Sequence, residues 1–261
     1  MRNILVSTIS FVNDNRKGSE IYTTFANRLI NDVLTKTPYD ILVTTNKPND
    51  FNNKQKSESR RVTVRHDELT NHKIFVNAFN QLLKCLAIKN IDKKYDWVLY
   101  LDCDAGFTTN LDITNLESKL DFWESKGYDM LALRTDLLYD EVEQKYLETK
   151  DLDTSAPPIF NGKFKLYGLH PEWRGAKLPS EHLLLIKNND KLEKMANIFE
   201  AFCTKFESQD PNNIVTFDME AFEIGVSAFL SGYNIGNLSW NEQNDLLKVG
   251  FNFNNWEKVK Y

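Results

Sequence analysis

One apolar run that ends in two aspartates constrains this chain more than any other stretch. The run from Trp97 to Leu101 favours a buried strand, and Asp102, Cys103 and Asp104 follow it directly. Because side chains alternate along a strand, we expect the two carboxylates to point the same way and to repel each other unless a cation lies between them. Mn²⁺ or Mg²⁺ suits such a pair of oxygen ligands and keeps positions open for phosphate oxygens. The alternative is a polar turn, in which aspartate is also common.

Strands and helices alternate through the first half of the sequence. The apolar patterns predict strands at 3–7, 40–44, 61–64, 97–101, 130–133, 182–186, 233–235 and 247–249, and helices at 19–34, 73–88, 114–126, 188–206 and 218–230. Ser19 is expected to cap the first helix, a capping box is expected to start at Thr114, and residues 140–168 are expected to be irregular. This alternation is typical of an α/β fold with a mostly parallel sheet and right-handed crossovers. No segment resembles a linker, so we expect residues 1–261 to form a single domain.

The composition favours a soluble protein of the reducing cytoplasm. The formal net charge is −5, so a broad basic field for nucleic acid is absent. The three widely spaced cysteines match neither a zinc site nor a disulfide framework, and no apolar run is long enough for a signal peptide or a membrane span. One segment, residues 47–65, is locally basic, with six Lys or Arg residues and two acidic ones. It could bind a polyanion, and a solvated loop is the alternative.

Polar residues stand where the first two predicted strands end. In parallel sheets, ligands bind outside the carboxyl ends of the strands. Ser7, Thr8 and Ile9 leave the first strand and Thr44 ends the second, so their hydroxyl and backbone groups could read a nucleobase and a ribose. The aspartates would then hold a metal ion under a diphosphate. The first strand lacks a Gly-x-Gly-x-x-Gly turn and no Gly-Lys-Ser/Thr loop is present, which argues against a dinucleotide cofactor and a phosphate loop.

The strand that leads into Asp102-Cys103-Asp104 resembles the Asp-x-Asp motif of nucleotide-sugar glycosyltransferases with the A-type fold. In layout the resemblance covers most of the chain. It implies one Rossmann-like domain, with a nucleotide-binding half at 1–110 and an acceptor-binding half at 111–261. It also implies a UDP-linked sugar donor held by the Asp-Cys-Asp unit and its metal ion, with Lys73 facing the diphosphate. Many relatives supply a third metal ligand from a C-terminal His motif, which the tail at 250–256 lacks.

Two later segments resemble the acceptor side of these enzymes. Residues 181–187 are similar to their acceptor-side strand, and residues 216–223 to the acidic helix start where an inverting enzyme places its base. Cleavage of the sugar–phosphate bond needs charge stabilisation on the leaving diphosphate, and inversion needs a general base. The candidate bases are Asp218, Glu220 and Glu181. The alternative is that Asp218 caps a helix and Glu220 stabilises its positive end.

A loop at residues 169–175 offers candidate acceptor contacts. Trp173 could stack on a sugar or a base, Arg174 could meet a phosphate, and His170 lies beside them in the sequence. The alternative is that these side chains pack against the protein itself.

The resemblance extends to the sugar transferases of T-even-type phages, which add glucose or arabinose to hydroxymethylcytosine in DNA. It implies double-stranded DNA as the acceptor, a location in the host cytoplasm, and DNA contacts from residues 47–65 and from the loop at Trp173 and Arg174. A bacterial surface saccharide or a small molecule is the alternative acceptor. The alternatives of another class are a metal-dependent nuclease or phosphatase and a non-catalytic nucleotide-binding module. A nuclease usually needs more acidic residues or histidines on neighbouring strand ends than this chain offers.

Overall fold

One seven-stranded sheet forms the centre of the protein. The computed structural model describes residues 1–12, 19–51, 60–68, 81–150, 161–209 and 220–251. The strands are β1 (Ile4–Ser10), β2 (Asp40–Thr45), β3 (Val62–His66), β4 (Trp97–Leu101), β6 (Met130–Ala132), β7 (Leu183–Lys187) and β8 (Ile235–Asn237), and they lie in the order β3-β2-β1-β4-β7-β6-β8. β1 to β4 are parallel, β7 is antiparallel to both of its neighbours, and β8 is parallel to β6. The expected α/β class with a mostly parallel sheet is confirmed.

The central strand β4 is buried on both faces. Trp97, Leu99 and Leu101 pack into one core cluster, and Val98 and Tyr100 pack into the cluster on the opposite face. A strand that is covered on both faces requires apolar side chains at every position. This requirement explains the unbroken apolar run before Asp102.

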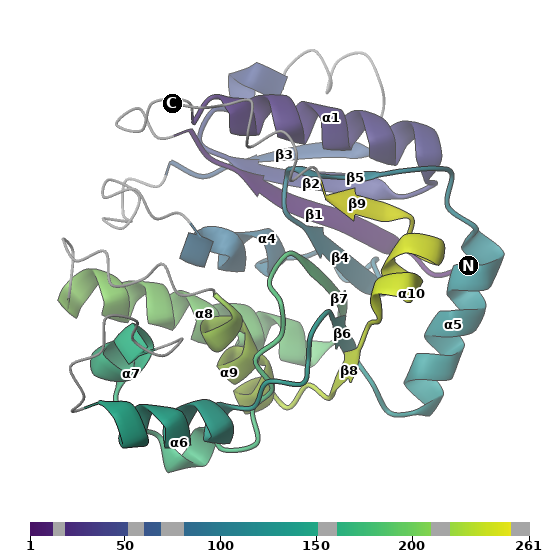
Figure 1. The fold of residues 1–261 in the computed structure, drawn as a ribbon. Coiled ribbons are helices and arrows are strands. Elements are labelled where there is room, and N and C mark those ends of the chain that lie inside the picture. Colours follow the sequence, from purple (N-terminus) through teal and green to yellow (C-terminus); the bar gives the residue numbers. More distant parts are fainter. Residues whose placement is uncertain (13–18, 52–59, 69–80, 151–160, 210–219, 252–261) are drawn as a thin grey trace.

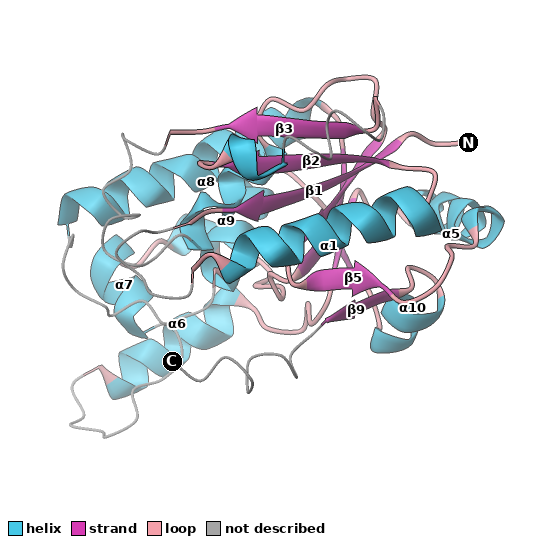
Figure 2. Cartoon of the chain, turned by 90° about the horizontal axis from the view of Figure 1, so that it is seen from above, coloured by secondary structure: helices cyan, strands magenta, loops and turns pink. Residues whose placement is uncertain are grey.

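Helices cover both faces of the sheet (Figure 1). The helices that pack on the face of Trp97 are α1 (Ile21–Lys36) and α5 (Ile113–Ser125). The helices on the other face are α4 (Cys85–Ile88), α8 (Asp190–Gln209) and α9 (Ala221–Ser231). Figure 2 shows a small second sheet beside α1, made of β5 (Ala105–Phe107) and β9 (Val249–Phe251), with α10 (Trp240–Asp245) next to it. Among the helices of the described ranges, none is both long enough and apolar enough to cross a membrane.

A group of helices extends the fold on the side of α9. It contains α6 (Tyr139–Thr149), α7 (Asn161–Tyr167) and the short 3-10 helix η3 (Pro171–Trp173), so the expectation of an irregular segment at 140–168 is wrong for most of its described part. An aromatic cluster holds these helices against α8 and α9; its buried rings belong to Tyr139, Phe164, Tyr167, Trp173, Phe202 and Phe222. These contacts join residues that are far apart in the sequence, so local sequence patterns do not predict the helices.

Several predicted helix starts differ from the structure. Ser19 is buried, and α1 begins two residues later with Glu20 as an N-cap that makes no side-chain capping hydrogen bond. Asp112, not Thr114, caps α5, because its carboxylate accepts a hydrogen bond from the main-chain N–H of Asn115. Of the helix predicted at 73–88, residues 73–80 lie outside the described ranges, and the rest is the 3-10 helix η2 (Gln81–Lys84) followed by α4.

Candidate functional site

The order of the strands points to one edge of the sheet as the ligand-binding edge. From β1 the chain runs outward to β2 and β3 on one side, and it then returns to place β4 on the other side of β1. In open α/β sheets such a switch point opens a crevice at the carboxyl ends of the two strands. Asp102 follows β4 at this edge, and Thr8 and Ser10 lie at the matching end of β1.

Asp102 lies in a dense network of hydrogen bonds and charge contacts. Its Oδ1 accepts a hydrogen bond from the Tyr100 hydroxyl at 2.7 Å and lies 3.0 Å from the Lys84 ammonium nitrogen. Its Oδ2 lies 2.9 Å from Nδ1 of His182 and 3.4 Å from Lys84. Burial alone would raise the pKa of the Asp102 carboxyl, but Lys84, His182 and Tyr100 lower it to about 2. Asp102 is therefore ionised and has partners on both oxygens.

Lys84 is the buried cation of this site. It is the last residue of η2 and only 8% exposed, and its ammonium lies between Asp102 and Glu220, 3.7 Å from Oε2 of the latter. Burial would lower the pKa of Lys84, but Asp102, Glu220 and Glu181 raise it above its ordinary value. The lysine therefore remains charged in the protein interior. Sequence reasoning missed it, and the one available signal was a lysine inside the apolar stretch 82–88.

Two buried glutamates complete the cluster, and each has one oxygen without a hydrogen-bond partner among the described residues. These atoms are Oε2 of Glu181 and Oε1 of Glu220, in side chains whose residues are 4% and 2% exposed. Glu181 and His182 reach the site because β7 is antiparallel to β4, so its first residue, Leu183, pairs with the last residue of β4. Glu220 stands at the start of α9 but makes no side-chain cap. Burial raises its pKa, and Lys84 opposes that rise.

The His182 ring links two of the carboxylates and remains partly open to solvent. Its Nε2 lies 3.6 Å from Oε1 of Glu181, and its side chain is 34% exposed. Burial would lower the pKa of His182, but the contact with Asp102 raises it above the ordinary histidine value. The cluster of Lys84, Asp102, Glu181, His182 and Glu220, here called the carboxyl-edge cluster, therefore combines two basic and three acidic groups.

The end of β1 carries further unpartnered polar atoms. The hydroxyls of Thr8 and Ser10 are buried and have no hydrogen-bond partner within the described chain. Two other residues predicted to bind the nucleotide sugar have hydrogen-bond partners within the protein. The Ser7 hydroxyl donates to the main-chain oxygen of Ala87, and the Thr44 hydroxyl accepts from Arg65. Ile9 packs against the core cluster on the α4 side. Buried polar atoms without partners are uncommon in folded proteins, so Thr8 and Ser10 mark a place where a ligand could supply hydrogen bonds.

The Asp-Cys-Asp unit is a turn, not the continuation of a strand. β4 ends at Leu101, and the main-chain N–H of Ala105 donates to the carbonyl of Asp102 across the turn. The alternation that predicted parallel carboxylates therefore does not apply to Asp102 and Asp104. Cys103 packs its side chain in the core, where burial raises the pKa of the thiol well above its usual range.

The sequence predicts a divalent ion at Asp102, but the groups that surround its carboxylate do not fit one. Each oxygen of this carboxylate already receives hydrogen bonds or the Lys84 charge, so metal coordination would have to displace them. Asp104 is 9% exposed, and its main-chain oxygen accepts a hydrogen bond from Arg28 at 2.5 Å. Within the described part of the chain, no three His, Cys, Asp or Glu residues are grouped as metal ligands. The metal role of Asp102 and Asp104 stays a prediction.

Two of the predicted site residues lie outside the described residues, namely Lys73 and Asp218. The loop at 169–175 is described, and its aromatic residue is not presented to a ligand. Trp173 is 8% exposed and packs edge-on against Tyr139, which favours the alternative that its ring packs against the protein itself; its contact with an acceptor stays a prediction. His170 stacks on the Trp173 ring with 3.9 Å between ring centroids, and Arg174 is paired with buried Glu143 at 2.7 Å.

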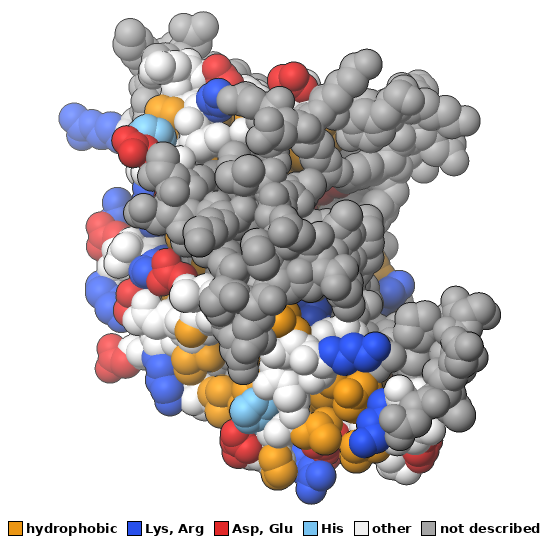
Figure 3. Space-filling view, turned by 90° about the vertical axis from the view of Figure 1, so that its left-hand side faces the viewer, with side chains coloured by type: hydrophobic (Ala, Val, Ile, Leu, Met, Phe, Trp, Pro, Cys, Tyr) orange, Lys and Arg blue, Asp and Glu red, His pale blue; other side chains and the backbone are white. Residues whose placement is uncertain are grey.

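The basic segment at 47–65 uses two of its arginines within the protein. Arg61 donates to the main-chain oxygens of Thr37 and Tyr39, and Arg65 donates to those of Leu86 and Lys89. These guanidinium groups tie the β3 segment to neighbouring elements, so they have a structural role, and their contact with a polyanion stays a prediction. In Figure 3, acidic and basic side chains are mixed where the surface belongs to described residues.

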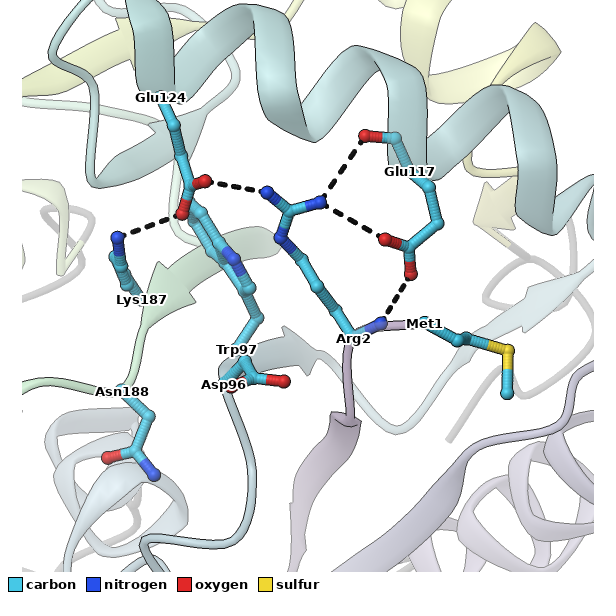
Figure 4. Close-up of a pocket in the computed structure, with 8 residues that line it drawn as sticks. All are labelled: Met1, Arg2, Asp96, Trp97, Glu117, Glu124, Lys187 and Asn188. Atoms are coloured by element: carbon cyan, nitrogen blue, oxygen red, sulfur yellow. Dashed lines mark hydrogen bonds and ion pairs between the residues drawn. The ribbon is translucent and has the colours of Figure 1, made fainter.

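A polar pocket of about 410 Å³ lies at the opposite edge of the sheet (Figure 4). Trp97, which lines this pocket, is the first residue of β4, and Asp102 follows the last residue of the same strand. The pocket and Asp102 therefore lie at opposite ends of β4. Arg2 fills part of it and forms ion pairs with Glu117, Asp121 and Glu124 of α5. These contacts fasten the start of β1 to α5, so we interpret the pocket as a structural feature of the amino edge.

Comparison with protein-family models and with curated proteins finds no match to this chain. The fold and the site alone define the class. It is an α/β protein with a mostly parallel central sheet and a buried lysine–carboxylate cluster at its carboxyl edge.

Proposed function

We propose that this protein transfers a sugar from a nucleoside diphosphate sugar to an acceptor hydroxyl at the carboxyl edge between β1 and β4. The observation that carries the proposal is the carboxyl-edge cluster itself. Oε2 of Glu181 and Oε1 of Glu220 are buried hydrogen-bond acceptors without donors in the part of the chain that the structure describes, and Lys84 beside them is a buried donor. A sugar is rich in hydroxyl groups that donate to carboxylates and accept from ammonium groups.

The groups of the cluster suit the two charge movements of glycosyl transfer. The bond between the anomeric carbon and the phosphate oxygen breaks, and its electron pair leaves with the diphosphate. Cationic donors fixed near that oxygen stabilise the developing charge, and the groups that could supply them are Lys84 and, when protonated, His182. The acceptor hydroxyl loses its proton as it bonds to the anomeric carbon, and Glu220 or Glu181 could take that proton. Burial raises the pKa of Glu220, which makes its carboxylate more basic.

Hydroxymethylcytosine in duplex DNA is the acceptor that we propose to test first, with a saccharide as the alternative. The support for DNA comes from the sequence resemblance alone, because Arg61 and Arg65 bind the protein's own main chain. Lys54 and Lys56 of the basic segment lie outside the described residues.

A donor panel tests the proposed reaction. We expect one or more of the UDP-, GDP-, CDP- or TDP-linked sugars to release its nucleoside diphosphate, and the release should rise when the correct acceptor is added. The acceptors are a duplex with hydroxymethylcytosine, the same duplex with cytosine, and a set of oligosaccharides. Mass spectrometry of the acceptor identifies the added sugar. Cleavage of the duplex or release of inorganic phosphate, without sugar transfer, would favour a nuclease or phosphatase instead.

A further inference from the structure

We infer that the Lys84 ammonium takes the place of a divalent ion at Asp102, so that this site binds a nucleoside diphosphate without added metal. The inference rests on the proposed function for its ligand. It concerns the carboxyl-edge cluster, in which Lys84 bridges Asp102 and Glu220.

The position of the ammonium is that of a bridging cation. Its nitrogen lies 3.0 Å and 3.4 Å from the two oxygens of Asp102 and 3.7 Å from Oε2 of Glu220. Carboxylates bind Mg²⁺ and Ca²⁺ at about 2.0 to 2.6 Å, so an ammonium and a metal ion cannot share this space. A metal ion at Asp102 would have to expel Lys84 or lie against it as a like charge.

The rest of the Asp102 shell also favours the lysine. The Tyr100 hydroxyl occupies one oxygen of Asp102, and the His182 ring occupies the other. Coordination to a metal would give up these hydrogen bonds in a buried place, where each lost partner is costly. Asp102 is therefore built to hold the ammonium in one orientation.

Lys84 holds a fixed positive charge that a phosphate oxygen could meet. An ammonium has three N–H donors, and among the described residues the carboxylates of Asp102 and Glu220 and the ring of Tyr100 lie around that of Lys84. The surroundings of Lys84 are largely free of water, because it is 8% exposed. A fixed donor in such a place interacts more strongly with a phosphate oxygen than it would in water.

The first arm of the test is a titration with Mn²⁺ alone, followed by electron paramagnetic resonance of the free ion. We expect no binding in the micromolar range to the wild-type protein. Lys84→Ala empties the space between Asp102 and Glu220 and should improve Mn²⁺ affinity by about tenfold or more. Adding Asp102→Asn to Lys84→Ala should remove that gain. Lys84→Arg keeps the positive charge and should not gain affinity, and Lys89→Ala, which opens the ion pair with Glu200, is the matched control.

The second arm measures UDP binding by calorimetry, once with EDTA and once with Mn²⁺. We expect the two dissociation constants to agree within about threefold. Micromolar Mn²⁺ binding by the wild-type protein that Asp102→Asn abolishes would overturn the inference, and so would UDP binding that requires Mn²⁺. The wild-type measurements decide this even if Lys84→Ala fails to fold. If UDP and the other nucleoside diphosphates bind under neither condition, the proposed function fails, and the Mn²⁺ titration still decides the role of Lys84.

Discussion

Asp102→Asn should lower kcat/KM for sugar transfer by about a hundredfold or more, comparable to the loss of a transition-state hydrogen-bond donor in other enzymes. Asparagine keeps the size of the side chain but removes the charge that orients Lys84 and His182. Both basic groups would then lose the position from which they meet the leaving diphosphate. The measurement is the rate of nucleoside diphosphate release with the donor that the panel identifies.

The control for this substitution is Asp121→Asn. The Asp121 side chain is 69% exposed and forms a surface ion pair with Arg2 at the opposite edge of the sheet. We expect this variant to keep wild-type activity. Thermal unfolding of both variants separates a loss of catalysis from a loss of structure. Wild-type activity in a folded Asp102→Asn protein would contradict the role that we assign to the carboxyl-edge cluster.

Lys163→Met should lower the free energy of unfolding by about 3 to 5 kcal/mol, the usual cost of removing one partner of a buried ion pair. Lys163 is 1% exposed, and its ammonium lies 2.6 Å from Oε1 of Glu223, which also accepts a hydrogen bond from Tyr167 at 2.8 Å. Without the lysine, the buried Glu223 carboxylate would lose its counter-charge inside the aromatic cluster. Urea unfolding followed by circular dichroism measures the loss.

Two further variants make this test specific. Lys165→Met changes an exposed lysine two residues away on the same helix and should leave the stability near that of the wild type. Adding Glu223→Leu to Lys163→Met removes both charges and should restore most of the lost stability. If Lys163→Met and Lys165→Met lower the free energy of unfolding equally, the buried ion pair does not stabilise the fold as we predict.

Most strands of the central sheet were predictable from the sequence because their signal is local, whereas β5 was missed and β8 and β9 begin two residues later than the strands predicted at 233–235 and 247–249. β4 is buried on both faces, and that burial requires the unbroken apolar run that the sequence displays. The helices α6 and α7 were missed for the opposite reason. Their buried rings pack against Phe202 and Phe222, which are distant from α6 and α7 in the sequence, and no local pattern predicts such contacts.

The candidate site was predictable in part. Asp102, Glu181 and Glu220 were singled out, and the fold brings all three around Lys84. The lysine itself escaped notice because a single lysine beside an apolar run gives no chemical pattern. The pairing of Asp102 with Asp104 assumed that the strand continues, whereas a turn begins at Asp102. Whether a side chain is already satisfied by its neighbours, as Asp102 is, can be seen only in the folded chain.

A crystal structure of the protein with a bound nucleoside diphosphate would test the central claim most directly. We predict that the diphosphate lies at the carboxyl ends of β1 and β4, with a phosphate oxygen within hydrogen-bond distance of the Lys84 ammonium. The hydroxyls of Thr8 and Ser10, which lack partners among the described residues, should be near the nucleoside. A nucleotide bound instead in the pocket beside Arg2 at the amino edge would contradict the account.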